Sequence, residues 1–202
     1  NYAFDGCMAL TSITIPDNVT TLGTYIFNKC YNLKSVTLPQ SLTSLSNYMF
    51  EECKSLTDII LDNVTTIGNN TFQGCESLGL TELPESITTI GTYAFHKCYN
   101  LKLTTLPSTI TRIESETFWL CTSITEMTIP ASVTTINGYA FEECTGLTQV
   151  TFLGKPSTIN SSTFSKCTNI ATIYVPWSSG QVSGAPWGAT KATIVYDYIP
   201  TV

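Results

Sequence analysis

Eight phenylalanines recur along this chain at intervals of 22 or 23 residues, and this regularity limits the possible folds more than any other feature. They are Phe4, Phe27, Phe50, Phe72, Phe95, Phe118, Phe141 and Phe164. A cysteine follows each of them by three residues: Cys7, Cys30, Cys53, Cys75, Cys98, Cys121, Cys144 and Cys167. A leucine or isoleucine follows each cysteine by three more. Self-similarity at this period predicts a solenoid in which each repeat forms one coil and packs on its neighbours.

Within one repeat the spacing of the apolar residues indicates the local structure. Val36 and Leu38 lie two residues apart, as on one face of a β-strand. A proline closes this strand in six of the repeats, because it has no N–H to donate. A second extended segment is typified by residues 87–90, and the spacing of Phe95 and Cys98 fits one turn of 3₁₀ or α-helix. Each coil is therefore expected to hold two short strands and a short helical (3₁₀) turn.

The composition excludes several classes of protein. Only 12% of the residues are charged, and the net charge of −6 is not accompanied by any run of Lys and Arg, which argues against a nucleic-acid partner. No apolar stretch approaches the ~20 residues that a membrane-spanning helix needs. The chain opens on Asn1 inside a repeat, with no initiator Met and no signal peptide. We therefore expect a fragment whose N-terminus is truncated within a coil.

The stretch from Cys7 to Cys30 contains the complete repeat: Cys, Leu, two aliphatic residues two apart, Pro, a Val-Thr pair, Gly, Phe and Cys. It recurs with small departures from Cys121 to Cys144. The pattern resembles the BspA-like class of leucine-rich repeats over about residues 1–176. The resemblance implies a mostly β fold, a curved right-handed leucine-rich-repeat solenoid of about eight coils of 22–23 residues. It also implies surface proteins of anaerobic host-associated bacteria, some protists and some phages, linked with adhesion and without shared catalytic residues.

The end of the repeat divides the chain into an expected solenoid, residues 1–176, and a C-terminal cap, residues 177–202, with a loop and a final strand. An open solenoid end would expose an unpaired strand edge and an apolar face. Trp177, Trp187 and Tyr196 are suited to lie over the last coil and cover that face.

The eight cysteines occupy an inward phase of the repeat. Equivalent residues of stacked strands lie about 4.8 Å apart, within reach of a disulfide, but their side chains run parallel rather than converging. A ladder of buried free thiols is therefore favoured, with disulfides between neighbouring coils and metal binding as the alternatives. The chain contains no Cys-x-x-Cys, and His96, its one histidine, has no ligand-type partner at useful spacing.

Functional residues in a repeat array are expected where outward positions depart from the common type. The outward positions of the Pro-terminated strand are mostly polar, but Ile60, Leu80 and Leu103 occupy them in the middle coils. One interpretation is an exposed apolar strip on the strand face, flanked by acidic residues such as Asp58 and Glu82, that contacts a partner. The alternative is a local bulge or register slip that turns Leu80 and Leu103 inward.

Aromatic residues near the phenylalanines suggest further candidate contacts. The residue after Phe is polar in most coils, but in one coil it is Trp119, followed by Leu120. An exposed Trp beside His96 is typical of an interaction hot spot, unless Trp119 folds over a neighbouring turn and fills a gap.

A column of tyrosines shares the position two residues before Phe and includes Tyr25, Tyr48 and Tyr93. Such a column can stack sugars or receive a protein loop. Alternatively, it covers the apolar edge of the turns.

These features predict a non-enzymatic module for surface binding or adhesion that recognises protein or glycan through a face of the solenoid. The alternative is a passive spacer or stalk of a larger surface or phage structural protein. One histidine, no phosphate-binding glycine loop and no clustered carboxylates leave no catalytic constellation, and no metal or cofactor site is expected. The expected partner is a host or cell-surface protein or glycan, with no nucleic acid and no membrane span. We expect the chain to be monomeric and extracellular, on a cell or virion surface.

Overall fold

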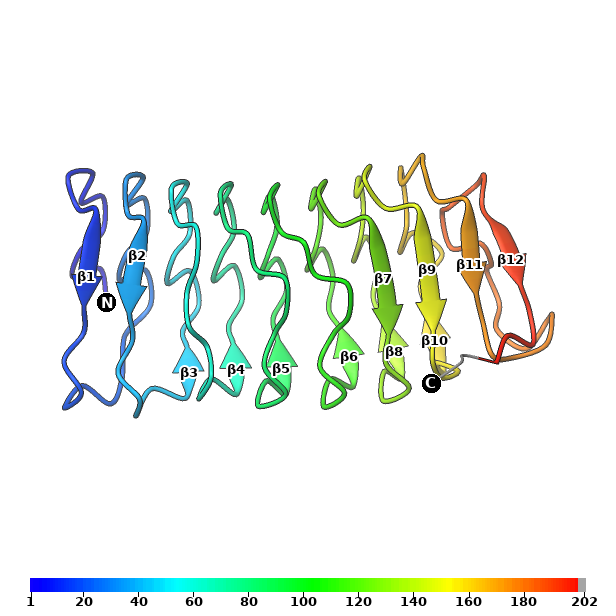
Figure 1. Ribbon diagram of the computed structural model, residues 1–202, viewed down its shortest axis with the longest axis horizontal. Helices are drawn as coiled ribbons and strands as arrows, with labels where there is room; N and C mark the ends of the chain where they lie inside the picture. Colours follow the sequence, from blue (N-terminus) through cyan, green and yellow to red (C-terminus); the bar gives the residue numbers. More distant parts are fainter. Residues whose placement is uncertain (200–202) are drawn as a thin grey trace.

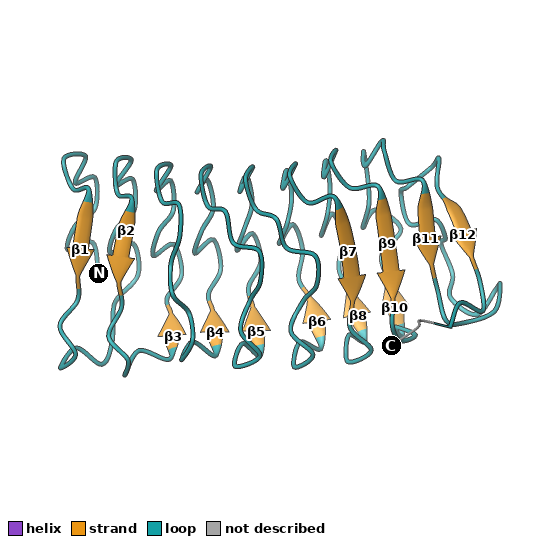
Figure 2. Cartoon of the chain, in the orientation of Figure 1, coloured by secondary structure: helices purple, strands orange, loops and turns teal. Residues whose placement is uncertain are grey.

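The computed structural model describes residues 1–199 and shows a solenoid in which each repeat forms one coil. The coils lie side by side from the N-terminus to the C-terminal end (Figure 1). All the strand pairs are parallel and join successive coils. Residues 1–199 contain no helix (Figure 2), and therefore none that could span a bilayer. The predicted mostly β solenoid is confirmed.

The strands form two rows along the solenoid. The first row, early in each coil, comprises β1 (Ser12–Thr14), β2 (Ser35–Thr37), β7 (Glu126–Ile129), β9 (Gln149–Phe152), β11 (Thr172–Tyr174) and β12 (Thr193–Val195). The second row, after the proline position, comprises β3 (Ser44–Leu45), β4 (Thr66–Ile67), β5 (Thr89–Ile90), β6 (Arg112–Ile113), β8 (Thr135–Ile136) and β10 (Thr158–Ile159). The first row divides into the sheets β1-β2 and β7-β9-β11-β12, and the second into β3-β4-β5 and β6-β8-β10.

The repeated phenylalanine and cysteine join neighbouring coils in the core. The eight Phe rings stack in one column, with centroids 5.1 to 5.6 Å apart. The N–H of each Phe donates to a carbonyl of the next coil, as Phe72 N does to Ala94 O at 2.8 Å. In return, the thiol of the next coil donates to the Phe carbonyl, as Cys98 Sγ does to Phe72 O at 3.1 Å. Each coil is thus tied to its neighbour in both directions.

This thiol bond recurs at seven successive coil junctions, with sulfur–oxygen distances of 2.9 to 3.2 Å. Burial raises the pKa of Cys30 to about 11 and raises the pKa of Cys75 and Cys98 well above the ordinary value. A raised thiol pKa keeps the proton on sulfur, and the proton is what makes the thiol a donor. The expected ladder of buried thiols is present in the structure.

The expected helical turn is replaced by two consecutive hydrogen-bonded turns. In the second coil Asn28 N donates to Tyr25 O at 3.3 Å, and Cys30 N donates to Phe27 O at 3.1 Å. Tyr25 and Lys29 each have a φ of 56°, in the left-handed region that a right-handed helix does not contain. Positive φ recurs at these two phases in most coils. The short helical turn of the prediction is therefore corrected to a pair of tight turns.

After the eighth coil the chain makes one further turn that covers the C-terminal end. Strand β12 pairs with β11, and Phe164 N donates to Trp187 O at 2.8 Å. Trp177 and Trp187 are buried edge to face with centroids 6.3 Å apart, and Tyr196 packs half-buried against the same core. Trp177 and Trp187 both pack against Phe152 of β9, with ring centroids 5.3 and 5.8 Å away. Residues 200–202, the end of the predicted cap, lie outside the described residues.

The thiol ladder predicts how the eight cysteines react with a water-soluble thiol reagent such as DTNB. In the native protein Cys7, which is exposed, should react, whereas the seven buried thiols should not, because their sulfur atoms are enclosed. In concentrated guanidinium all eight should react. A count below eight in the denatured, unreduced protein would mean that disulfides join the coils and would contradict the ladder.

Candidate binding surface

The first row of strands is interrupted over three coils between β2 and β7 (Figure 2). Backbone bonds between coils survive there only where each segment begins and where the row resumes: Thr57 N to Lys34 O, Gly79 N to Thr57 O, Lys102 N to Leu80 O and Thr128 N to Thr104 O. Within the described chain, residues 58–62 and 81–84 make no backbone hydrogen bond to a neighbouring coil. Along these segments the strand face therefore lacks the hydrogen bonds between coils that a regular sheet would have.

In two of the three coils, a change in which side chains face inward accounts for the interruption. Leu80 and Leu83 are buried, whereas the two residues between them, Thr81 and Glu82, are both exposed. Successive side chains of a β-strand point to opposite faces, so two consecutive outward residues cannot belong to a regular strand. The segment bulges instead, and the ladder to its neighbours is lost.

The next coil repeats this pattern, and the predicted apolar strip is wrong in consequence. Leu103 is fully buried and Leu80 is only 9% exposed, because the register slip turns both toward the core. The slip was the alternative interpretation, and it is correct. Ile60 is the member of the strip that does face solvent, with 73% of its surface exposed.

Two grooves flank Ile60 on this open face. The larger, of about 790 Å³, runs across residues 57–62, 79–85 and 105–107. The smaller, of about 460 Å³, lies between the strand segment of the second coil and that of the third. Ile60, Leu61 and Asp62 line both grooves, so they form a low ridge between them.

The grooves carry negative charge only. Their lining includes five carboxylates and no Lys, Arg or His: Asp17, Asp58, Asp62, Glu82 and Glu85. None of the five takes part in an ion pair in the described structure. No three His, Cys, Asp or Glu side chains within residues 1–199 come close enough together to hold a metal ion. The carboxylates are therefore spread along the grooves rather than gathered at one point.

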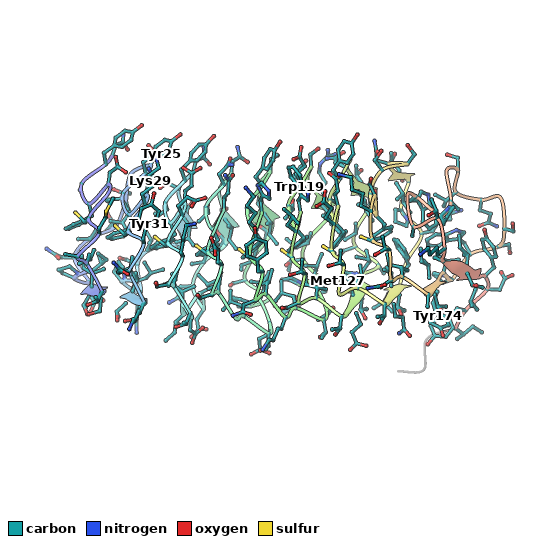
Figure 3. The ribbon with its side chains drawn as sticks, turned by 90° about the horizontal axis from the view of Figure 1, so that it is seen from above. Tyr25, Lys29, Tyr31, Trp119, Met127 and Tyr174 are labelled. Atoms are coloured by element: carbon teal, nitrogen blue, oxygen red, sulfur yellow. The ribbon has the colours of Figure 1, made fainter. Side chains whose placement is uncertain are left out.

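The second predicted group, around Trp119, lies on the other side of the solenoid. Figure 3 shows Tyr25 and Trp119 on the side opposite Met127 of β7 and Tyr174 of β11. The Trp119 ring stacks on His96 with centroids 4.4 Å apart and planes within 4°. His96 is buried, and Trp119 and Leu120 are half-buried. The stack fills the gap between two coils, which favours the alternative interpretation of Trp119.

The environment of His96 keeps its imidazole neutral. Burial, with a smaller contribution from the charge of Lys97, lowers the pKa of His96 to about 4. Neither imidazole nitrogen, nor Nε1 of Trp119, has a hydrogen-bond partner within residues 1–199. A charged imidazole here would be buried without a partner, which is unfavourable.

The tyrosine column also stacks on itself. The rings of Tyr2, Tyr25 and Tyr48 are parallel, with centroids 4.9 and 4.4 Å apart, so their faces cover one another. Tyr93 stands apart and donates its hydroxyl to Glu116 Oε1 at 2.7 Å, a bond that raises the pKa of Tyr93. A sugar stacks on the face of an aromatic ring, and most of these faces are occupied. The column therefore covers the edge of the turns.

Sequence reasoning noticed Asp58 and Glu82 but did not place them in a groove with Asp17, Asp62 and Glu85. The available signal was Asp62, which stands where most coils have proline. The remaining two lie in loops after the strand, where an acidic residue is unremarkable in sequence.

Comparison with known proteins decides the family. The model of the BspA type leucine rich repeat region matches residues 1–124 and 65–184, with six copies of the repeat. The chain belongs to the BspA-type leucine-rich repeat family. A comparison with curated protein sequences found no match.

Solved structures share the BspA-type fold. A leucine-rich repeat protein from Bacteroides ovatus ATCC 8483 has a TM-score of 0.72 and 24% identity over 96% of this chain and 57% of its own. The T. pallidum leucine rich repeat protein has a TM-score of 0.65 and 26% identity over 73% of this chain and 69% of its own. A leucine rich cell surface protein from Faecalibacterium prausnitzii A2-165 has a TM-score of 0.57 and 24% identity over 100% and 66%. The BspA-type chain described here thus spans little more than half of the first of these proteins.

The register slip predicts different costs for truncating two apolar side chains. Leu103→Ala should lower the free energy of unfolding by about 2–5 kcal/mol, because it leaves a cavity in the core. Ile60→Ala should change it by no more than about 0.5 kcal/mol, since Ile60 is solvent-exposed. Urea unfolding of the two variants measures the difference. Equal, small effects would show that Leu103 is not buried.

The lowered pKa of His96 predicts a pH-dependent stability. Between pH 6.5 and about 4 the unfolded chain binds a proton at this imidazole and the folded chain does not, so stability falls as the pH falls through this window. His96→Phe keeps a ring against Trp119 but cannot titrate. Thermal unfolding across this window should therefore show a shallower pH slope in His96→Phe than in the unmodified protein. Identical slopes would contradict the burial of a neutral His96.

Proposed function

We propose that this BspA-type chain is a non-enzymatic binding module of a cell or virion surface, which recognises a protein or glycan through the strand face. The observation that carries the proposal is the interruption of that face around Ile60. A regular solenoid continues its sheet without a break, but here the break leaves two grooves on either side of an exposed isoleucine.

The exposure of Ile60 supports a contact role. The side chains next to it in its segment, Ile59 and Leu61, are 5% and 4% exposed and belong to the core. Ile60 therefore contributes nothing to the core that its neighbours do not already supply. Apolar surface rimmed by polar residues is a common feature of interaction sites, and here carboxylates line the grooves on both sides of Ile60.

The structural relatives support the surface location. One structural relative is described as a leucine rich cell surface protein. The fold also presents a long, rigid face without requiring any catalytic group, because the repeated residues of each coil are used for packing.

The test is an array of glycans and extracellular-matrix proteins probed with this chain and with two variants. Ile60→Ser should weaken binding to the recognised array component by about tenfold or more. Leu153→Ser removes an exposed apolar side chain outside both grooves and should leave binding unchanged. Binding that survives Ile60→Ser would exclude the strand face around Ile60. If no array component is bound at all, the chain is a spacer rather than a binding module.

A further inference from the structure

We propose that the two grooves hold an extended, positively charged segment of a partner protein, with its basic side chains on the groove carboxylates and its backbone against the open edge of β2. This inference rests on the proposed binding function and names the chemistry of the ligand. Three observations lead to it: the sign of the charge, its distribution and the open strand edge.

The sign of the charge selects a cationic partner. The carboxylates of Asp58, Asp62 and Glu82 are exposed and line the larger groove, with no basic side chain in its lining. Lys34 and Lys102 begin the strand segments of their coils but line neither groove. Like-charge contacts oppose association and opposite charges steer it. An acidic glycan would therefore be repelled, and a neutral one would leave the carboxylates without partners.

The distribution of the charge selects an extended partner. The five carboxylates come from the first, third and fourth coils and do not converge on a cation site within residues 1–199. A single metal ion needs several ligands around one point. A chain with a basic residue at every second position instead presents charges on one side about 6.6 to 6.8 Å apart. The positive charges of such a chain are therefore distributed along the groove, as the carboxylates are.

The edge of β2 supplies backbone partners for that chain. Thr37 O accepts from Ile15 N, so the backbone of Thr37 faces β1. Backbone groups of successive strand residues alternate between the two neighbouring strands, and the N–H and C=O of Val36 therefore face the gap. Residues 58–62, which lie on that side, make no backbone hydrogen bond to a neighbouring coil, and Val36 lines the smaller groove. An added strand forms main-chain hydrogen bonds with such an edge.

Ile60 completes the surface. It stands on the ridge between the grooves, where an apolar side chain of the partner can cover it. A segment that alternates basic and apolar residues therefore satisfies all three features, because its period of two matches an extended backbone.

The test uses a fluorescein-labelled octapeptide of alternating lysine and valine, titrated with this chain and followed by fluorescence anisotropy. Binding should weaken by about tenfold in the triple variant Asp58→Asn, Asp62→Asn, Glu82→Gln. A matched triple variant of carboxylates outside both grooves, Glu51→Gln, Glu116→Gln, Glu126→Gln, carries the same net charge and should bind within about twofold of the unmodified chain.

Two further peptides separate charge from backbone recognition. The glutamate–valine octapeptide should not bind, and the lysine–valine peptide N-methylated at alternate residues should bind at least about fivefold more weakly, because it lacks the N–H groups for the strand edge. Equal loss in both triple variants would mean that the peptide responds to net charge alone and would overturn the proposal. Undiminished binding of the N-methylated peptide would overturn the strand-edge part.

The two experiments together distinguish failure of the cationic-segment proposal from failure of the proposed binding function. If the array identifies a recognised component whose binding is lost in Ile60→Ser but kept in the groove triple variant, the chain is a binding module and the cationic segment is wrong. If the array shows no binding and the octapeptide binds only in proportion to net charge, both are wrong.

Discussion

The hydrogen bond from each buried thiol to the phenylalanine carbonyl of the preceding coil is the contact on which the rest of the solenoid depends. It joins residues 25 or 26 positions apart and recurs at seven junctions with nearly constant geometry. A thiol is a weak donor, but here it acts together with the Phe N–H bond and the stacked Phe ring in one place. Cysteine suits the position because it is small, apolar and still able to donate.

This arrangement concentrates the coil-to-coil connection on one side of each coil. The tight turns around Phe and Cys set the spacing of the coils, and the first row of strands adds to it where it forms. The coils between β2 and β7 show that the strand side can lose its ladder while the Phe column continues: the Phe50–Phe72 and Phe72–Phe95 distances are 5.5 and 5.4 Å, as elsewhere. Sequence changes on the strand side are therefore structurally tolerated, which is the physical condition for a binding surface.

The repeat was sufficient to predict the solenoid, the inward phases and the cysteine ladder, because each of these follows from a residue type that returns once per coil. The direction of Leu80 and Leu103 was not predictable from position alone. Both stand at an outward phase, and only the presence of two exposed residues after each shows that the backbone has bulged. The positive φ values in the turn were not predictable from the sequence either, since Tyr25 and Lys29 are not residues that favour positive φ.

The two sides of the solenoid consequently differ in what they can still bind. On the turn side the aromatic rings stack on one another: Tyr25 lies between Tyr2 and Tyr48, and Trp119 stacks on His96. Such stacking adds to the stability of the array but leaves ring edges and hydroxyls as the accessible groups. On the strand side the opposite holds, because residues 58–62 and 81–84 make no backbone hydrogen bond to a neighbouring coil, the groove carboxylates form no ion pair, and Ile60 is exposed. A surface binds through groups whose interactions within its own fold are incomplete, and in this chain those groups gather around Ile60.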